Sequence, residues 1–136
     1  MSNTPNPPPR RLPWAFTIGW LIFISGVVFV ADRRLLTPIF SFIRAHPESD
    51  KLGHFILIGG MAFLLNLSLG VREVRWLGLG WLVGSLLVGT VFTLEEISQI
   101  WIPSRTFDFL DLAGDYTGIF FFGWLAKRVA MRRGQL

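Results

Sequence analysis

The sequence predicts an all-α integral membrane protein, a four-helix bundle with a short interfacial segment between the first two helices. Only 16% of its 136 residues are charged, against about a quarter in a soluble domain, and the mean hydropathy is +0.51. Its apolar residues gather in four long stretches, at 13–31, 52–70, 76–94 and 112–126. Because a helix needs roughly 20 apolar residues to cross a bilayer core, we interpret each stretch as one span. The fourth reaches that length only if the residues from Phe107 also insert.

These spans form one predicted domain, 13–130, between a disordered cytoplasmic tail at 1–12 and a basic cytoplasmic tail at 131–136. The first tail is polar and rich in proline, a composition typical of disorder. The first apolar stretch is longer than the ~7–15 residues of a signal peptide, so we interpret it as a retained anchor. The chain has no cysteine, which excludes a disulfide, a thiol nucleophile and a thiolate metal site.

The positions of the basic residues predict the topology. If both termini lie on one side, that side holds eight of the thirteen Lys and Arg residues and the other side holds five. The positive-inside rule then places both termini in the cytoplasm. The chain is basic, with a pI of about 10.7, but these residues flank the spans and form no separate patch. This excludes a nucleic-acid binder and leaves membrane lipids as the expected partners.

Polar residues recur at helical spacing near the outer ends of the predicted spans. Lys51 and His54 are three residues apart at the start of the second helix, so they share a face. Glu96 and Gln99 have the same spacing at the end of the third. Asp50 precedes the second helix and is its predicted N-cap. All of these groups lie at a similar shallow depth.

The fourth helix repeats the pattern with acids. Asp108 is its predicted N-cap. Asp111 and Asp115 follow three and seven residues later, on one stripe of the helix. Gly118 continues this stripe and offers a place where another helix can approach closely.

Charged groups at membrane depth are tolerated where they face the bundle interior or a water-filled cavity. We therefore expect one outward-facing pocket built from three helices. Its predicted lining residues are Lys51, His54, Glu96, Gln99, Arg105, Asp111 and Asp115.

The two segments "DKLGHF" and "EISQIWIPSRTFDFLDLAGDYTG" resemble the VanZ-like membrane proteins. The pattern of that family runs D-K-x-x-H, E-x-x-Q, P-x-R-x-x-D-x-x-D and N-x-x-G. Two positions depart from it: Asp115 stands where the family usually has Asn, and Ile58 where a Tyr often follows the His. The matching positions are Asp50, Lys51, His54, Glu96, Gln99, Pro103, Arg105, Asp108, Asp111 and Gly118.

The resemblance implies a multi-pass protein of the bacterial cell (inner) membrane, and it implies the fold and the cell envelope rather than a reaction. The naming member of the family is linked to low-level resistance to the glycopeptide teicoplanin. The resemblance therefore implies a link between this protein and antibiotic resistance.

The polar residues themselves leave three interpretations open. In an enzyme, the predicted substrate is a phosphate-bearing lipid or a cell-wall precursor, with His54, Glu96 and Asp111 catalytic and Lys51, Gln99, Arg105 and Asp115 binding. The same pocket is equally suited to binding without chemistry. A third interpretation is a closed ionic network that locks the helices together. The sequence predicts no cofactor and no metal site, because one His among oxygen ligands indicates no particular ion.

Overall fold

The computed structural model describes residues 11–33, 47–101 and 107–134. The predicted N-terminal tail lies largely outside the described residues, and the predicted interfacial segment and Arg105 lie outside them. The predicted basic tail at 131–136 is described as far as Gly134, and α5 extends into it to Arg132.

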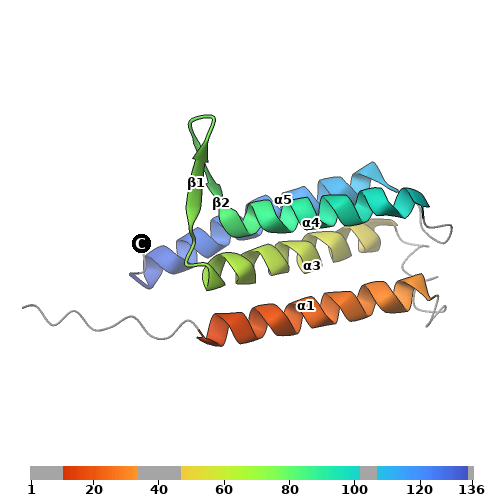
Figure 1. Ribbon diagram of the computed structural model, residues 1–136, viewed down its shortest axis with the longest axis horizontal. Coiled ribbons are helices and arrows are strands. Elements are labelled where there is room, and N and C mark those ends of the chain that lie inside the picture. The colour runs from red at the N-terminus through yellow and green to blue at the C-terminus, as the bar shows by residue number, and fades with distance from the viewer. Residues whose placement is uncertain (1–10, 34–46, 102–106, 135–136) are drawn as a thin grey trace, which may run out of the picture.

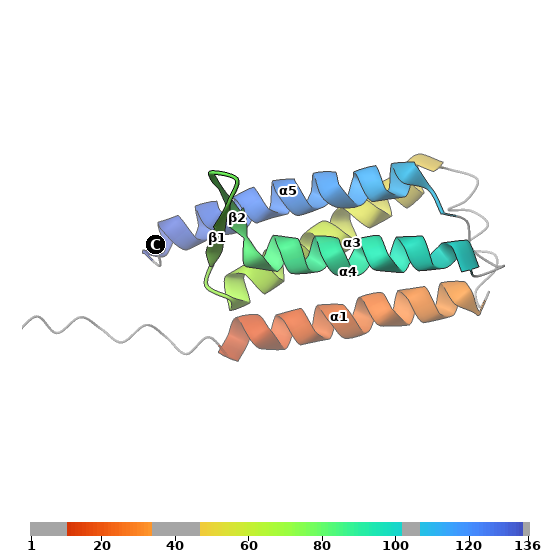
Figure 2. The same cartoon turned by 45° about the horizontal axis from the view of Figure 1, so that its top comes forward.

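Four long helices dominate the described part of the chain and confirm the all-α class. They lie side by side, and each runs opposite to the one before it in the chain (Figures 1 and 2). Consequently α1 begins and α5 ends at the same end of the bundle. The four helices are α1 (Arg11–Asp32), α3 (Pro47–Ser68), α4 (Val83–Ser98) and α5 (Phe109–Arg132).

Two of these helices are long and apolar enough to cross a membrane. Residues Pro13–Val30 of α1 and Lys51–Ser68 of α3 have mean hydropathies of 1.9 and 1.4. By contrast, α4 has 16 residues and rises about 24 Å, less than the ~30 Å of a bilayer core. By length and composition, these two helices are thus candidate membrane spans.

The predicted third span is wrong at its start. Instead of a helix from Trp76, the chain forms an antiparallel hairpin of β1 (Glu73–Trp76) and β2 (Leu79–Leu82), which projects sideways from the bundle (Figure 1). Leu77 and Gly78 form its two-residue turn, with φ of 52° and 77°, as a type I′ turn requires. The helix α4 therefore begins seven residues later than predicted.

The end of α3 explains why the chain leaves the helix before the hairpin. Gly70 has φ 69°, and its N–H donates to the carbonyl of Leu67 at 3.1 Å. The N–H of Val71 donates to the carbonyl of Asn66 at 2.7 Å. These two bonds are a Schellman motif, in which glycine takes the left-handed position without a steric penalty.

The central helix is α3, which packs mainly against α5 and also contacts α1 and α4. Glycines let α3 and α5 come close. A Cβ atom on Gly59 would lie 3.0 Å from the backbone of Gly118, and one on Gly118 would strike the carbonyl group of Phe55. The predicted close approach at Gly118 is confirmed. Around this contact lies an apolar core of Ile24, Ile58, Met61, Ala62, Val88 and Ile119.

Buried polar groups join the helices at the hairpin end. Asn66 of α3 is fully buried, at 0% exposure. Its Oδ1 accepts the N–H of Ser85 at 3.2 Å, and its Nδ2 donates to Ser85 Oγ at 2.9 Å. Leu82, the N-cap of α4, has no side-chain acceptor, so Asn66 caps α4 from another helix. Nothing in the sequence pattern singled out this residue.

Replacing Gly118 with alanine should destabilise the bundle, because the new methyl group would push α5 away from the Phe55 carbonyl. Overpacking of this kind costs about 1–3 kcal/mol. The matched control is Gly26→Ala in α1, where a Cβ meets nothing within 4 Å and better helix propensity should leave stability equal or higher. Thermal unfolding in detergent measures both. Similar melting temperatures for the two variants would contradict the close contact.

Candidate functional site

Six of the seven predicted pocket residues meet at one end of the bundle. The helices alternate in direction, so α3 begins, α4 ends and α5 begins at this end (Figure 1). The seventh, Arg105, is outside the described residues. The six described residues contact two more, Glu95 and Asp108. We call these eight residues the polar cluster: Lys51, His54, Glu95, Glu96, Gln99, Asp108, Asp111 and Asp115.

Lys51 connects α3 to the start of α5. Its Nζ lies 2.8 Å from Asp111 Oδ1 and 3.3 Å from Asp108 Oδ2. Asp108 is the N-cap of α5, as predicted, and its Oδ1 accepts the backbone N–H of Leu110 at 2.8 Å. The Leu110 N–H and, after it, the Lys51 ammonium hold the pKa of Asp108 below its ordinary value. Asp108 therefore stays a carboxylate at neutral pH.

The predicted cap at the start of α3 is wrong. This helix begins at Pro47, which places Asp50 inside the first turn instead of before it. Proline is favoured at the first helical position, where its missing N–H leaves no donor unsatisfied and its φ already suits a helix. The three residues before the predicted cap, 47–49, are therefore already helical.

His54 lies next to two acids of α5. Its Nδ1 lies 2.9 Å from Asp115 Oδ1, and its Nε2 lies 3.9 Å from Asp111 Oδ2. The side chain of Asp115 is only 4% exposed, whereas that of His54 is 25% exposed. A carboxylate beside Nδ1 favours the tautomer that carries its proton there, so that Nε2 becomes the acceptor. The two acids of α5 thus hold the ring of His54 in a defined orientation.

Glu96 connects the end of α4 to the start of α5. It is 1% exposed, and its Oε1 accepts the backbone N–H of Asp108 at 2.9 Å. Its Oε2 accepts the amide of Gln99 at 2.9 Å. Gln99 belongs to the short helix η1 (Gln99–Trp101) and also reaches Glu95 Oε2 at 3.3 Å. Sequence reasoning left Glu95 out of the pocket, although its spacing of four residues from Gln99 is a signal of contact.

These contacts form a continuous network across four elements, α3, α4, η1 and α5. Among the described residues, every buried side-chain nitrogen or oxygen has a hydrogen-bond partner, as native interiors require. Within the same residues, no group of three or more His, Asp or Glu side chains is arranged to hold a metal ion. The cluster is thus able to lock helices together, and through His54 it is also able to transfer a proton.

No family model, curated protein or solved structure matches the chain. The interpretation of the polar cluster therefore rests on its own residues and geometry.

A double-mutant cycle with Lys51→Met and Asp111→Asn should give a coupling energy above 1 kcal/mol, because a hydrogen bond between charged groups contributes about 1.5–3 kcal/mol and this one is largely sheltered. The matched control is the pair of Lys127 and Glu73, with side chains 41% and 36% exposed. Exposed pairs typically give about 0.2–1 kcal/mol. Unfolding free energies measure both cycles, and equal coupling in the two would show that the cluster is not a sheltered network.

Proposed function

We propose that this chain is a VanZ-like, multi-pass protein of the bacterial cell membrane. All four helices cross the bilayer, both ends of the chain are cytoplasmic, and the polar cluster opens to the outside. Support comes from the residues that carry the resemblance. They come from three separate sequence segments, and those with described side chains share one network of contacts, as the members of one site do.

The surface of the bundle supports four spans. Large apolar side chains are exposed on α4 and α5 as well as on α1, a pattern that soluble monomers avoid over large areas. A span as short as α4 is accommodated when the bilayer thins locally. The exposed side chains on the later helices include Leu87 at 50%, Val91 at 58%, Leu94 at 61%, Phe120 at 59% and Phe121 at 48%.

The polar cluster, in this proposal, binds a phosphate-bearing lipid or cell-wall precursor and transfers a proton through His54. The single observation that carries the proposal is the pair of a buried Asp115 and a partly exposed His54. Asp115 orients the imidazole, so that Nε2 is the base and, once protonated, the acid. A protein that engages a cell-wall precursor at the outer face would change what a glycopeptide such as teicoplanin meets there.

The other members of the cluster have supporting roles. The Lys51 ammonium has three N–H donors, and described residues occupy two of them. The third is able to meet a phosphate oxygen, together with the predicted contact from Arg105. Glu96 and Gln99 hold the ends of α4 and α5 in place, which makes them positioning residues.

A second candidate is a purely structural cluster. The specific observation in its favour is that Lys51 already bridges two carboxylates, which leaves the described part of the cluster rich in acids. In this alternative the protein is a non-enzymatic envelope protein, and the network only locks α3, α4 and α5 together.

Binding of a polyprenyl phosphate separates the two candidates. Added to the protein in detergent, polyprenyl phosphate should raise the melting temperature, whereas the uncharged polyprenol should not. Lys51→Met should abolish this increase, while His54→Gln should keep both the fold and the increase, because it removes the acid–base group and leaves the cations. If polyprenyl phosphate has no effect, and if His54→Gln and Glu96→Gln both unfold the protein, the structural candidate stands instead.

The topology is tested with single cysteines, since the chain has none of its own. Ser49→Cys lies at the exposed start of α3 and should react with an impermeant thiol reagent on intact cells. Arg75→Cys on the hairpin is the control and should react only after the cells are opened. Labelling of Arg75→Cys from outside would invert the topology, and labelling of both from outside would exclude the four-span arrangement.

A further inference from the structure

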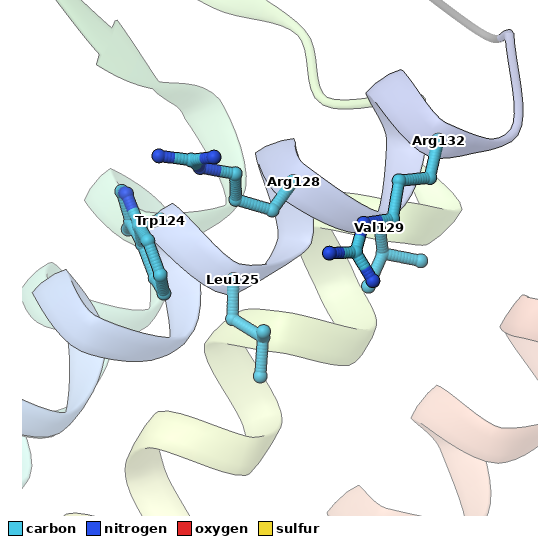
Figure 3. Close-up of a pocket in the computed structure, with 5 residues that line it drawn as sticks. All are labelled: Trp124, Leu125, Arg128, Val129 and Arg132. Carbon is cyan, nitrogen blue, oxygen red and sulfur yellow. The ribbon is translucent and has the colours of Figure 1, made fainter.

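A second feature lies at the opposite end of α5 from the polar cluster. Five residues of its last turns line a pocket of about 160 Å³, namely Trp124, Leu125, Arg128, Val129 and Arg132 (Figure 3). Trp124 lies nine positions after Asp115, the last residue of the polar cluster, which is about 14 Å along the helix. The pocket is therefore a site of its own.

The charged part of this pocket suits a phosphate group. Arg128 and Arg132 are four residues apart and share a face of α5. The guanidinium carbon of Arg128 lies 5.1 Å from the centroid of the Trp124 ring, which holds its planar fork in one orientation. A guanidinium presents paired donors that match two oxygens of a phosphate.

Neither arginine is neutralised within the part of the chain that the structure describes. The ion pairs of the described residues include no contact to Arg128 or Arg132, and Glu73 of the neighbouring hairpin is paired with Lys127. The carbonyl end of α5 carries a partial negative charge that repels anions, so the two guanidinium groups must supply the attraction themselves.

The other walls of the pocket are apolar. Leu125 and Val129 are partly buried, and Trp124 is 51% exposed; Leu125 lies between the other two (Figure 3). A soluble phosphate has no apolar part to contact these walls, whereas a lipid has both an anionic head group and apolar chains. Tryptophan and arginine are also the residues that meet lipid head groups at membrane surfaces.

We propose that this pocket binds the head-group phosphate of an anionic phospholipid of the inner leaflet. The phosphate lies between Arg128 and Arg132, the glycerol backbone lies against Trp124 and Leu125, and the acyl chains continue along the apolar face of α5. The site lies beyond the polar cluster and depends on the proposed function only for its side of the membrane, so binding in detergent is independent of that topology.

The test is native mass spectrometry of the full chain in neutral detergent, with phosphatidylglycerol and zwitterionic phosphatidylcholine as probes. The parent protein should bind phosphatidylglycerol preferentially, and Arg128→Gln/Arg132→Gln should bind it about 30-fold more weakly, the effect expected for two arginines near a head group. The control is Arg72→Gln/Arg75→Gln, which removes the same charge from the hairpin and should keep the preference. An unchanged preference in the first variant, or an equal loss in both, overturns the site.

Two further arms make the result specific. Glycerol 3-phosphate at millimolar concentration should not compete with phosphatidylglycerol; full competition would assign the pocket to a soluble phosphate and overturn the lipid. If the glutamine variant does not fold, Arg128→Lys/Arg132→Lys keeps the charge and removes the bidentate fork. It should bind severalfold more weakly, and unchanged binding overturns the proposal. Stabilisation by polyprenyl phosphate, which depends on Lys51, should persist in these variants, so the two sites fail separately.

Discussion

The close contact of α3 with α5 is the constraint on which the rest of the structure depends. At the crossing, Gly59 and Gly118 have no side chains, and the two backbones meet with no room for a Cβ atom. Glycines allow helices in a membrane to approach in this way. Only at this separation do Lys51 and His54 on α3 reach Asp111 and Asp115 on α5 through direct contacts of 2.8 and 2.9 Å. The polar cluster is thus a consequence of two missing side chains.

The second constraint is that every buried polar group needs a partner, since an unpaired one costs several kcal/mol. Two buried groups show how the fold meets it. Glu96, at 1% exposure, accepts the N–H at the start of α5, and Asn66, at 0%, accepts one at the start of α4. Both side chains cap a helix other than their own. Connections between helices are therefore fixed at both ends of the bundle.

The fixed geometry of a helix makes the shared faces of the polar cluster predictable from the sequence. Spacings of three and four residues placed Lys51 with His54 and Asp111 with Asp115 on shared faces, and the structure brings these faces together. The hairpin was not predicted because the part of it that lies inside the predicted third span, 76–82, is as apolar as the rest of that span. Hydropathy does not distinguish a strand from a helix. What makes this segment a hairpin is local: Leu77 and Gly78 form a turn in which both residues have positive φ. The capping role of Asn66 depends on a contact between distant helices, which no local pattern contains.

Asp115 is the residue whose chemistry distinguishes a purely structural cluster from a proton-transfer site. A neutral Asn, the residue that the VanZ-like pattern usually has here, offers either an acceptor oxygen or a donor NH₂ to a ring nitrogen, so both histidine tautomers fit. A carboxylate only accepts, so its 2.9 Å contact with Nδ1 favours a proton on that nitrogen and leaves Nε2 with the lone pair. A fixed tautomer adds little to a purely structural cluster, because a hydrogen bond from either tautomer would join α3 to α5. It matters to the proton transfer proposed for His54, because a substrate would reach that side chain through its exposed part, 25% of its surface.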